Sequence, residues 1–82
     1  MEERIGVVAI VVSNKDAVPS VQNVLSAHCN VIQGRMGIPS KESCKNVIAL
    51  IVKGTVEEIS ALTGALGRIK DVQAKSVLTS NK

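Results

Sequence analysis

The 82-residue sequence contains no phenylalanine, tyrosine or tryptophan, and it has only two cysteines, two prolines and one histidine. Without aromatic side chains, the chain has no platform on which unpaired nucleic-acid bases could stack. A hydrophobic core must instead be built from Val, Ile, Leu, Ala and Met. Two cysteines are too few for a disulfide scaffold, and we expect both to stay reduced in a cytoplasmic setting.

Long hydrophobic runs are also missing. No unbroken apolar stretch is longer than Val7 to Val12, which Val47 to Val52 equals in length, whereas a helix that crosses a bilayer needs roughly 18 apolar residues or more. The opening Met1-Glu2-Glu3-Arg4 is acidic, whereas the start of a signal peptide is basic. We therefore expect a cytoplasmic protein that makes no contact with a membrane.

Positive charge is in slight excess, because the chain has 10 Lys and Arg but 7 Asp and Glu, which gives a net charge of +3. These charges are spread along the chain and form no long block of like sign. No basic helix is apparent that could enter a DNA groove, so direct DNA binding is not expected. A chain of 82 residues has the length of one small domain, which we expect to span residues 1–82.

Four segments have the alternation expected of β-strands. Arg4 to Val12 and Lys45 to Lys53 carry apolar, mostly β-branched side chains on both faces, which is typical of strands covered on both sides. Val31 to Pro39 and Val72 to Leu78 are interrupted by glycines and polar residues, which suit edge strands. We expect the polar segment Ser40 to Ser43 to form the turn between the second and third strands.

Two helices are expected between these strands. In the first, apolar residues recur at helical spacing over residues 17–28, and either Asn14 or Asp16 can cap the helix. The second begins with a capping box at Thr55, continues with an apolar stripe, and ends at Gly67.

The order of elements is thus strand, helix, strand, strand, helix, strand, which is the split βαβ unit. Right-handed crossovers place the two doubly apolar strands in the centre of the sheet and the weaker strands at its edges. We predict an α+β, ferredoxin-like βαββαβ fold with an antiparallel four-stranded sheet in the order 4-1-3-2. Both helices should cover the same face of this sheet.

The opposite face of the predicted sheet would then expose a patch of Val, Ile and Leu side chains to water. A monomer rarely exposes a patch of that kind. We therefore expect a homo-oligomer, either a dimer or a tetramer, that packs through the bare sheet face or through an edge strand. The alternative is that a single antiparallel sheet tolerates a few exposed valines.

The residues whose side chains could take part in chemistry favour binding over catalysis. His28 has no partner for nucleophilic or general base chemistry, and no glycine-rich phosphate motif follows a strand, so we expect no enzyme. His28 is then a helix cap or a residue at the core's edge. An alternative is a metal- or redox-responsive oligomer that uses His28 and Cys29 across a subunit interface. Within one subunit, Cys44 should lie on the order of 25–30 Å from Cys29, at about 3.3 Å per strand residue.

Two features could bind a small polar ligand. Asn14, Lys15 and Asp16 join the first strand to the first helix, where backbone N–H groups can hold an anion. Arg35 stands between two glycines on a predicted edge strand, where a ligand or partner can approach the backbone closely. The simpler alternatives are an ordinary helix cap and a bulged edge. The sequence predicts no particular cofactor.

Three segments resemble the small regulators of the iron-only hydrogenase system: Gly34 to Pro39, Ile59 to Ile69 and Val72 to Val77. The resemblance implies a ferredoxin-like fold similar to ACT domains and to the C-terminal domain of nickel-responsive regulators. ACT domains bind small effectors at subunit interfaces, near the loop that corresponds here to residues 14–16. The resemblance thus implies a non-enzymatic regulatory protein that binds an effector between subunits, with Arg35 as a further contact, and acts through a partner protein. A purely structural assembly module is the remaining alternative.

Overall fold

A computed structural model describes residues 2–40 and 45–79 of the chain. Most of the predicted turn over residues 40–43, and Cys44 with its expected distance from Cys29, lie outside the described residues. The elements, in chain order, are β1 (Arg4–Val12), the 3-10 turn η1 (Lys15–Ala17), α1 (Val18–Ala27), the 3-10 turn η2 (Cys29–Val31), β2 (Ile32–Ser40), β3 (Lys45–Gly54), α2 (Val56–Gly67) and β4 (Val72–Leu78).

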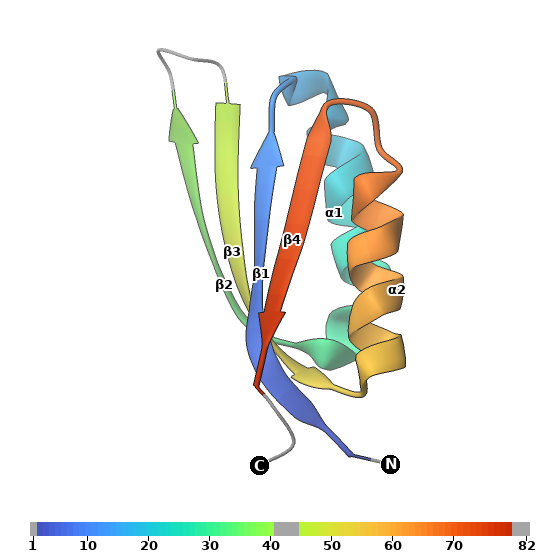
Figure 1. The fold of residues 1–82 in the computed structure, drawn as a ribbon. Coiled ribbons are helices and arrows are strands. Elements are labelled where there is room, and N and C mark those ends of the chain that lie inside the picture. The colour runs from blue at the N-terminus through green and yellow to red at the C-terminus, as the bar shows by residue number, and fades with distance from the viewer. Residues whose placement is uncertain (1, 41–44, 80–82) are drawn as a thin grey trace.

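The four strands form one antiparallel sheet in the order β2-β3-β1-β4, and both helices lie against the same face of it (Figure 1). This arrangement confirms the predicted βαββαβ fold, the 4-1-3-2 order and the assignment of β2 and β4 to the edges. The strands with apolar side chains on both faces, β1 and β3, are paired in the centre along their whole length. Their double hydrophobicity is what selects the central places, because an edge strand would expose its backbone and side chains to water.

The core lies between the sheet and the two helices. On β1, Val8, Ile10 and Val12 point toward the helices and are 0–1% exposed, whereas the alternate residues Ile5 and Val7 are 51% and 41% exposed. This contrast follows from the two-residue period of a strand. The buried hydrophobic residues are Val8, Ile10, Val12, Val21, Leu25, Val31, Ile48, Leu50, Val52, Ile59, Leu62, Leu66 and Val72.

The start of α2 confirms the predicted capping box. The Glu58 backbone N–H donates to Thr55 Oγ1 over 3.1 Å, and the Thr55 N–H donates to Glu58 Oε1 over 2.8 Å. Two of the N–H groups left without intrahelical partners at a helix start are thereby satisfied. The α2 segment can therefore begin directly after β3 without a connecting loop.

The start of α1 differs from the prediction. Asn14 caps a 3-10 turn, because its Oδ1 accepts from the Asp16 N–H over 3.0 Å, and Asp16 caps nothing. The α-helix itself starts only at Val18 and has no side-chain cap, with Pro19 in its first turn. The tighter 3-10 turn absorbs the residues between the Asn14 cap and the proline. At the other end, His28 is the C-cap of α1, as expected.

The first and last strands hold each other at both ends. The Ser13 N–H donates to the Asp71 carbonyl over 2.8 Å at one end, and the Thr79 N–H donates to the Ile5 carbonyl over 2.9 Å at the other. Asp71 has a φ of 66°, and it is the one non-glycine residue with positive φ in ranges 2–40 and 45–79. An aspartate tolerates this left-handed conformation better than most residues, so it can make the sharp turn from α2 into β4.

Candidate functional site

The sheet surface turned away from the helices, here called the outer sheet face, is largely apolar on β1, β2 and β3. On β4 it carries Val77 beside the polar residues Gln73 and Lys75. Its exposed fractions run from 41% at Val7 to 75% at Val77. Its large hydrophobic side chains are Ile5, Val7, Met36, Ile38, Val47, Ile51 and Val77.

Strand register makes the outer sheet face continuous. Val7 lies opposite both Ile51 and Val77, and Val47 lies opposite Ile38. Facing residues of this kind have Cβ atoms about 4.5–5.5 Å apart, so their side chains touch across the strands. Strands of seven to ten residues, taken as about nine at ~3.3 Å per residue and four abreast at ~4.8 Å, give a face of roughly 30 by 19 Å, or about 570 Å². This area includes Lys53, Gln73 and Lys75, so its apolar part is the size of the largest patch on a typical monomer, which is often functional.

The segment Asn14 to Asp16 lies at one end of the sheet and is fastened to the turn before β4. Asn14 Nδ2 donates to Asp71 Oδ2 over 3.4 Å. The Asp16 and Ala17 N–H groups donate to Asn14 Oδ1 and to its carbonyl, over 3.0 and 2.9 Å. A depression of about 290 Å³ there is lined by Asn14, Asp16, Ala17, Ser20, Ile69, Lys70 and Asp71. These backbone donors are engaged within the loop, and two carboxylates share the depression with Lys70.

Arg35 lies elsewhere, on the helix side of β2, where its Nη1 donates to Gln22 Oε1 of α1 over 3.2 Å. A second depression, here called the Arg35 groove, has a volume of about 170 Å³ between α1 and the strands β2 and β3. It is lined by Val18, Gln22, Arg35, Gly37, Ile38, Asn46, Val47 and Ile48. Within one chain the structure therefore does not bring Arg35 into the same depression as Asn14 and Asp16, and Lys15 lines neither of the two depressions.

His28 and Cys29 are neighbours at the end of α1. The His28 Nδ1 lies 3.0 Å from the Val24 carbonyl oxygen, so one ring nitrogen is engaged by the helix, and Cys29 is exposed. Over residues 2–40 and 45–79, no three His, Cys, Asp or Glu residues come close enough to hold a metal ion. Within these ranges, His28 and Cys29 have no third ligand for a metal.

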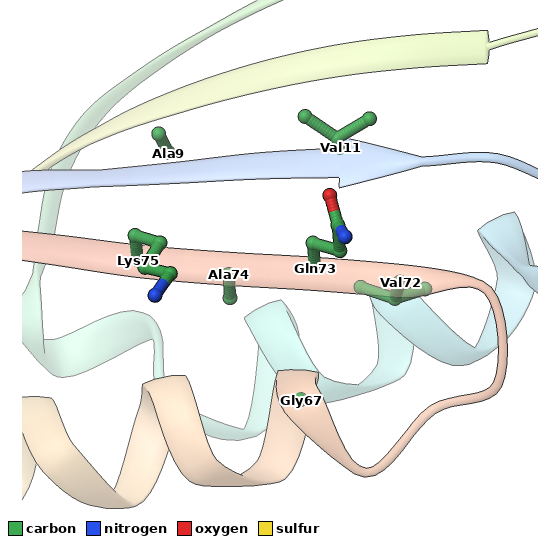
Figure 2. A pocket seen from close by; sticks show the side chains of 7 residues that line it. All are labelled: Ala9, Val11, Gly67, Val72, Gln73, Ala74 and Lys75. Atoms are coloured by element: carbon green, nitrogen blue, oxygen red, sulfur yellow. The ribbon is translucent and has the colours of Figure 1, made fainter.

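The largest depression of those described here, about 380 Å³, runs along the free edge of β4 (Figure 2). Val72 and Ala74 point toward the helices, where Gly67 of α2 lies, and Gln73 lies beside Val11 of β1. Lys75 is the one charged residue that lines it. This depression offers the edge of a sheet and small apolar side chains, with no nucleophile and base together.

Two residues of the Arg35 groove, Gln22 and Asn46, were not expected from the sequence. A signal for Gln22 was present, since Val18 and Gln22 are four residues apart and so share a face of α1. Asn46 is the second residue of β3 and precedes its apolar run; it pairs with Pro39 of β2. The sequence alone does not show that either residue lies near Arg35, because that proximity depends on the register of β2 against β3.

The topology, with two helices on one face of a β2-β3-β1-β4 sheet, defines a ferredoxin-like fold. Residues 4–76 match the TM1266-like family, whose provisional description is "Iron-only hydrogenase system regulator". The chain belongs to this family. In the described ranges, no helix is long and apolar enough to cross a membrane.

Solved structures agree with this assignment. The uncharacterized protein TM1266 from Thermotoga maritima superposes with a TM-score of 0.91 at 32% identity, covering 96% of this chain and 100% of that one. A formyltetrahydrofolate deformylase from Pseudomonas syringae pv. tomato str. DC3000 matches at 14% identity and TM-score 0.66, over 96% of this chain but 28% of the enzyme. CPII, a nitrogen regulatory PII-like protein from Thiomonas intermedia K12 bound to ADP, AMP and bicarbonate, matches at 8% identity and TM-score 0.52, over 98% of this chain and 100% of that one. At such low identities the last two similarities concern the fold alone. No curated protein matches the chain significantly.

Proposed function

We propose that this protein is a non-enzymatic, cytoplasmic regulator of the iron-only hydrogenase system that works as a homo-oligomer and binds a small effector at a subunit interface. The family description supports the regulatory role. The single observation that carries the oligomer is the outer sheet face. In this proposal, a second copy of this chain packs on the outer sheet face.

The composition of the outer sheet face supports a second copy. Its large side chains are Val, Ile and Met, and Val and Ile also make up most of the core; obligate interfaces resemble a domain core cut in half. A standard interface buries about 800 Å² per partner, which is about 15% of the 5425 Å² accessible surface of this chain. Two copies related by a two-fold axis would stack their sheets about 10 Å apart, as sheets do in β-sandwiches.

The effector would act by changing the stability of this assembly. A ligand that contacts two subunits stabilises the assembled state by its difference in affinity between the two states. Asn14, Lys15 and Asp16 lie together at one end of the sheet, and Arg35 lies elsewhere on the chain. These residues could therefore share a ligand only across an interface. The changed assembly would then be what a partner protein recognises. Whether that assembly is a dimer or a tetramer decides which of these residues meet.

Sedimentation equilibrium tests the interface. Ile51 is 47% exposed near the middle of the outer sheet face, so Ile51→Lys should leave the fold intact but place a charge in the interface. Ala61→Lys, on the solvent side of α2, is the matched control, because it adds the same charge where no partner packs. We expect an oligomer for the unaltered protein and for Ala61→Lys, and a monomer for Ile51→Lys. A monomeric unaltered protein at every concentration would refute the interface.

A native mass spectrum of anaerobically purified protein tests the effector. An oligomer that carries additional non-covalent mass supports an effector, and the mass identifies its class. Replacing Asn14, Asp16 and Arg35 with Ala should then reduce the bound fraction. If all three substitutions leave the bound mass unchanged, these residues do not form the site.

A further inference from the structure

We infer that the Arg35 groove is the binding site for a small aliphatic monocarboxylate. This inference rests on the proposed function, because it names the chemical class of the effector, but its evidence is the lining of the groove itself. The groove combines hydrogen-bond donors on one wall with an apolar floor. That combination fits an anion with a short hydrocarbon tail.

The donors converge from two elements. The Arg35 guanidinium carries several N–H donors, of which the bond to Gln22 Oε1 uses one. Because Arg35 can only donate, the Gln22 amide must turn its oxygen toward Arg35, and its NH₂ group remains for another acceptor. Within residues 2–40 and 45–79, no carboxylate is paired with Arg35. A ligand carboxylate would supply the missing negative charge and accept a pair of hydrogen bonds from the planar guanidinium.

The apolar floor exists because residue 37 is a glycine. A Cβ at Gly37 would lie 3.7 Å from Ile48 Cγ1, so any side chain here would stand in the groove. Val18 of α1 supplies an apolar side chain opposite, and Ile48 is only 7% exposed. A hydrocarbon tail placed on this floor would remove apolar surface from water on both partners.

The size of the groove guides the choice of ligand. The groove is open to solvent, and its 170 Å³ is the volume of about six water molecules at ~30 Å³ each, so a probe of about six non-hydrogen atoms matches it. Butyrate has that size. Inorganic phosphate would meet the Arg35 charge but would leave the apolar floor uncovered, so we expect it to bind more weakly.

The groove also adjoins the outer sheet face. Ile38 and Val47 line the groove and face each other across β2 and β3 as part of that face. A second copy packed on the outer sheet face would therefore lie at the mouth of the groove. Occupation of the groove and assembly would stabilise each other, since coupling between two binding events is reciprocal.

Titration of isotope-labelled full-length protein with butyrate, followed by NMR, tests the inference. We expect saturable shifts of the Gln22 and Asn46 side-chain amides and of the Gly37 backbone amide. Butylamine has the same length and the opposite charge, and it should cause no saturable shift there. Equal binding of butylamine would refute the role of Arg35, and binding of phosphate as tight as that of butyrate would refute the role of the floor.

Matched variants locate the site. Arg35→Met keeps most of the apolar stem and should weaken butyrate binding at least about tenfold, because a charged hydrogen-bond partner is lost. The control Arg68→Met removes an exposed arginine at the end of α2 and should change nothing. Unchanged affinity in Arg35→Met would overturn the inference.

Filling the groove is an independent test. Gly37→Val should block butyrate, whereas Gly64→Val on the exposed side of α2 should not, because a Cβ at Gly64 meets nothing within 4 Å and lies away from the groove. If Gly37→Val fails to fold, Gly37→Ala serves, since its Cβ makes only ordinary contacts. Undiminished binding in a folded Gly37 variant would refute the site. Butyrate binding to a monomer would support the groove as a binding site and refute the interface. An oligomer that binds no butyrate would support the interface and refute the groove as a binding site.

Discussion

Gly6, in the central strand β1, provides the sharpest test of how the sheet is held together. A Cβ at this position would lie 2.2 Å from the Val77 carbonyl oxygen and 2.6 Å from Leu78 Cδ2 of β4. Such contacts do not occur below 3.0 Å, so the β4 backbone would have to move by at least 0.8 Å, the difference between 3.0 and 2.2. Gly6→Ala should therefore strain the pairing of β1 with the last strand.

The size of the effect follows from two opposing contributions. An alanine in place of glycine lowers the entropy of the unfolded chain and stabilises the fold by about 0.4–1 kcal/mol. Overpacking against an ordered backbone costs typically about 1–3 kcal/mol. We expect a net decrease of about 1–2 kcal/mol in the free energy of unfolding. Gly34→Ala, where a Cβ meets nothing within 4 Å, should show only the favourable contribution.

Denaturant unfolding followed by far-UV circular dichroism measures both variants. The chain has no tryptophan or tyrosine, so intrinsic fluorescence is of no use here. All proteins should be compared at the same concentration, because association contributes to apparent stability. A Gly6→Ala protein as stable as Gly34→Ala would contradict the close approach of β1 and β4.

Three further substitutions test other features. Thr55→Ala removes the side-chain half of the capping box and should cost about 1 kcal/mol of unfolding free energy, and no change in a denaturant melt would dispute the cap. Leu62→Ala empties a fully buried position under the sheet and should cost about 2–5 kcal/mol, so a cost like that of a surface substitution would mean that α2 does not pack as described. Cys29→Ser, at an exposed position, should change neither stability nor assembly; loss of a bound metal in the anaerobic native mass spectrum would instead favour the metal-responsive alternative that uses His28 and Cys29.

The fold could be predicted because local patterns and topology agree. β1 and β3 are apolar on both faces. Only a central strand of a sheet covered by two helices has one face buried and both edges paired, so these two strands belong in the centre. The capping box at Thr55 fixed the start of α2 to the residue. The start of α1 was harder, since Asn14, Asp16 and Pro19 allow an α-helix or a 3-10 turn followed by one. That choice depends on how the loop meets Asp71, which is more than 50 residues away along the chain.

The candidate site was less accessible from sequence. The place of Arg35 between two glycines predicts a binding residue, but its contact with Gln22 depends on which face of β2 it occupies. A bulge between Ile32 and Gly34 shifts the register of β2 against β3 and so changes that face. The pattern of β2 is too weak to locate such a bulge, because glycine and proline have no clear preference for either face. The oligomer, the cytoplasmic location and the ligand contacts of Asn14, Lys15, Asp16 and Arg35 stay predictions.

The pairing of β1 with β4 also bears on how the protein is made. The two segments that meet lie far apart along the chain, since Arg4 Nη1 donates to the Thr79 carbonyl across 75 residues. In the sheet, β1 and β4 lie side by side (Figure 1). Until β4 has been synthesised, one edge of β1 has no partner, and closing so long a loop slows the formation of this pairing. In that interval β1 presents an open edge beside an apolar face. Pairing of this open edge with the wrong neighbour then competes with completion of the chain's own sheet.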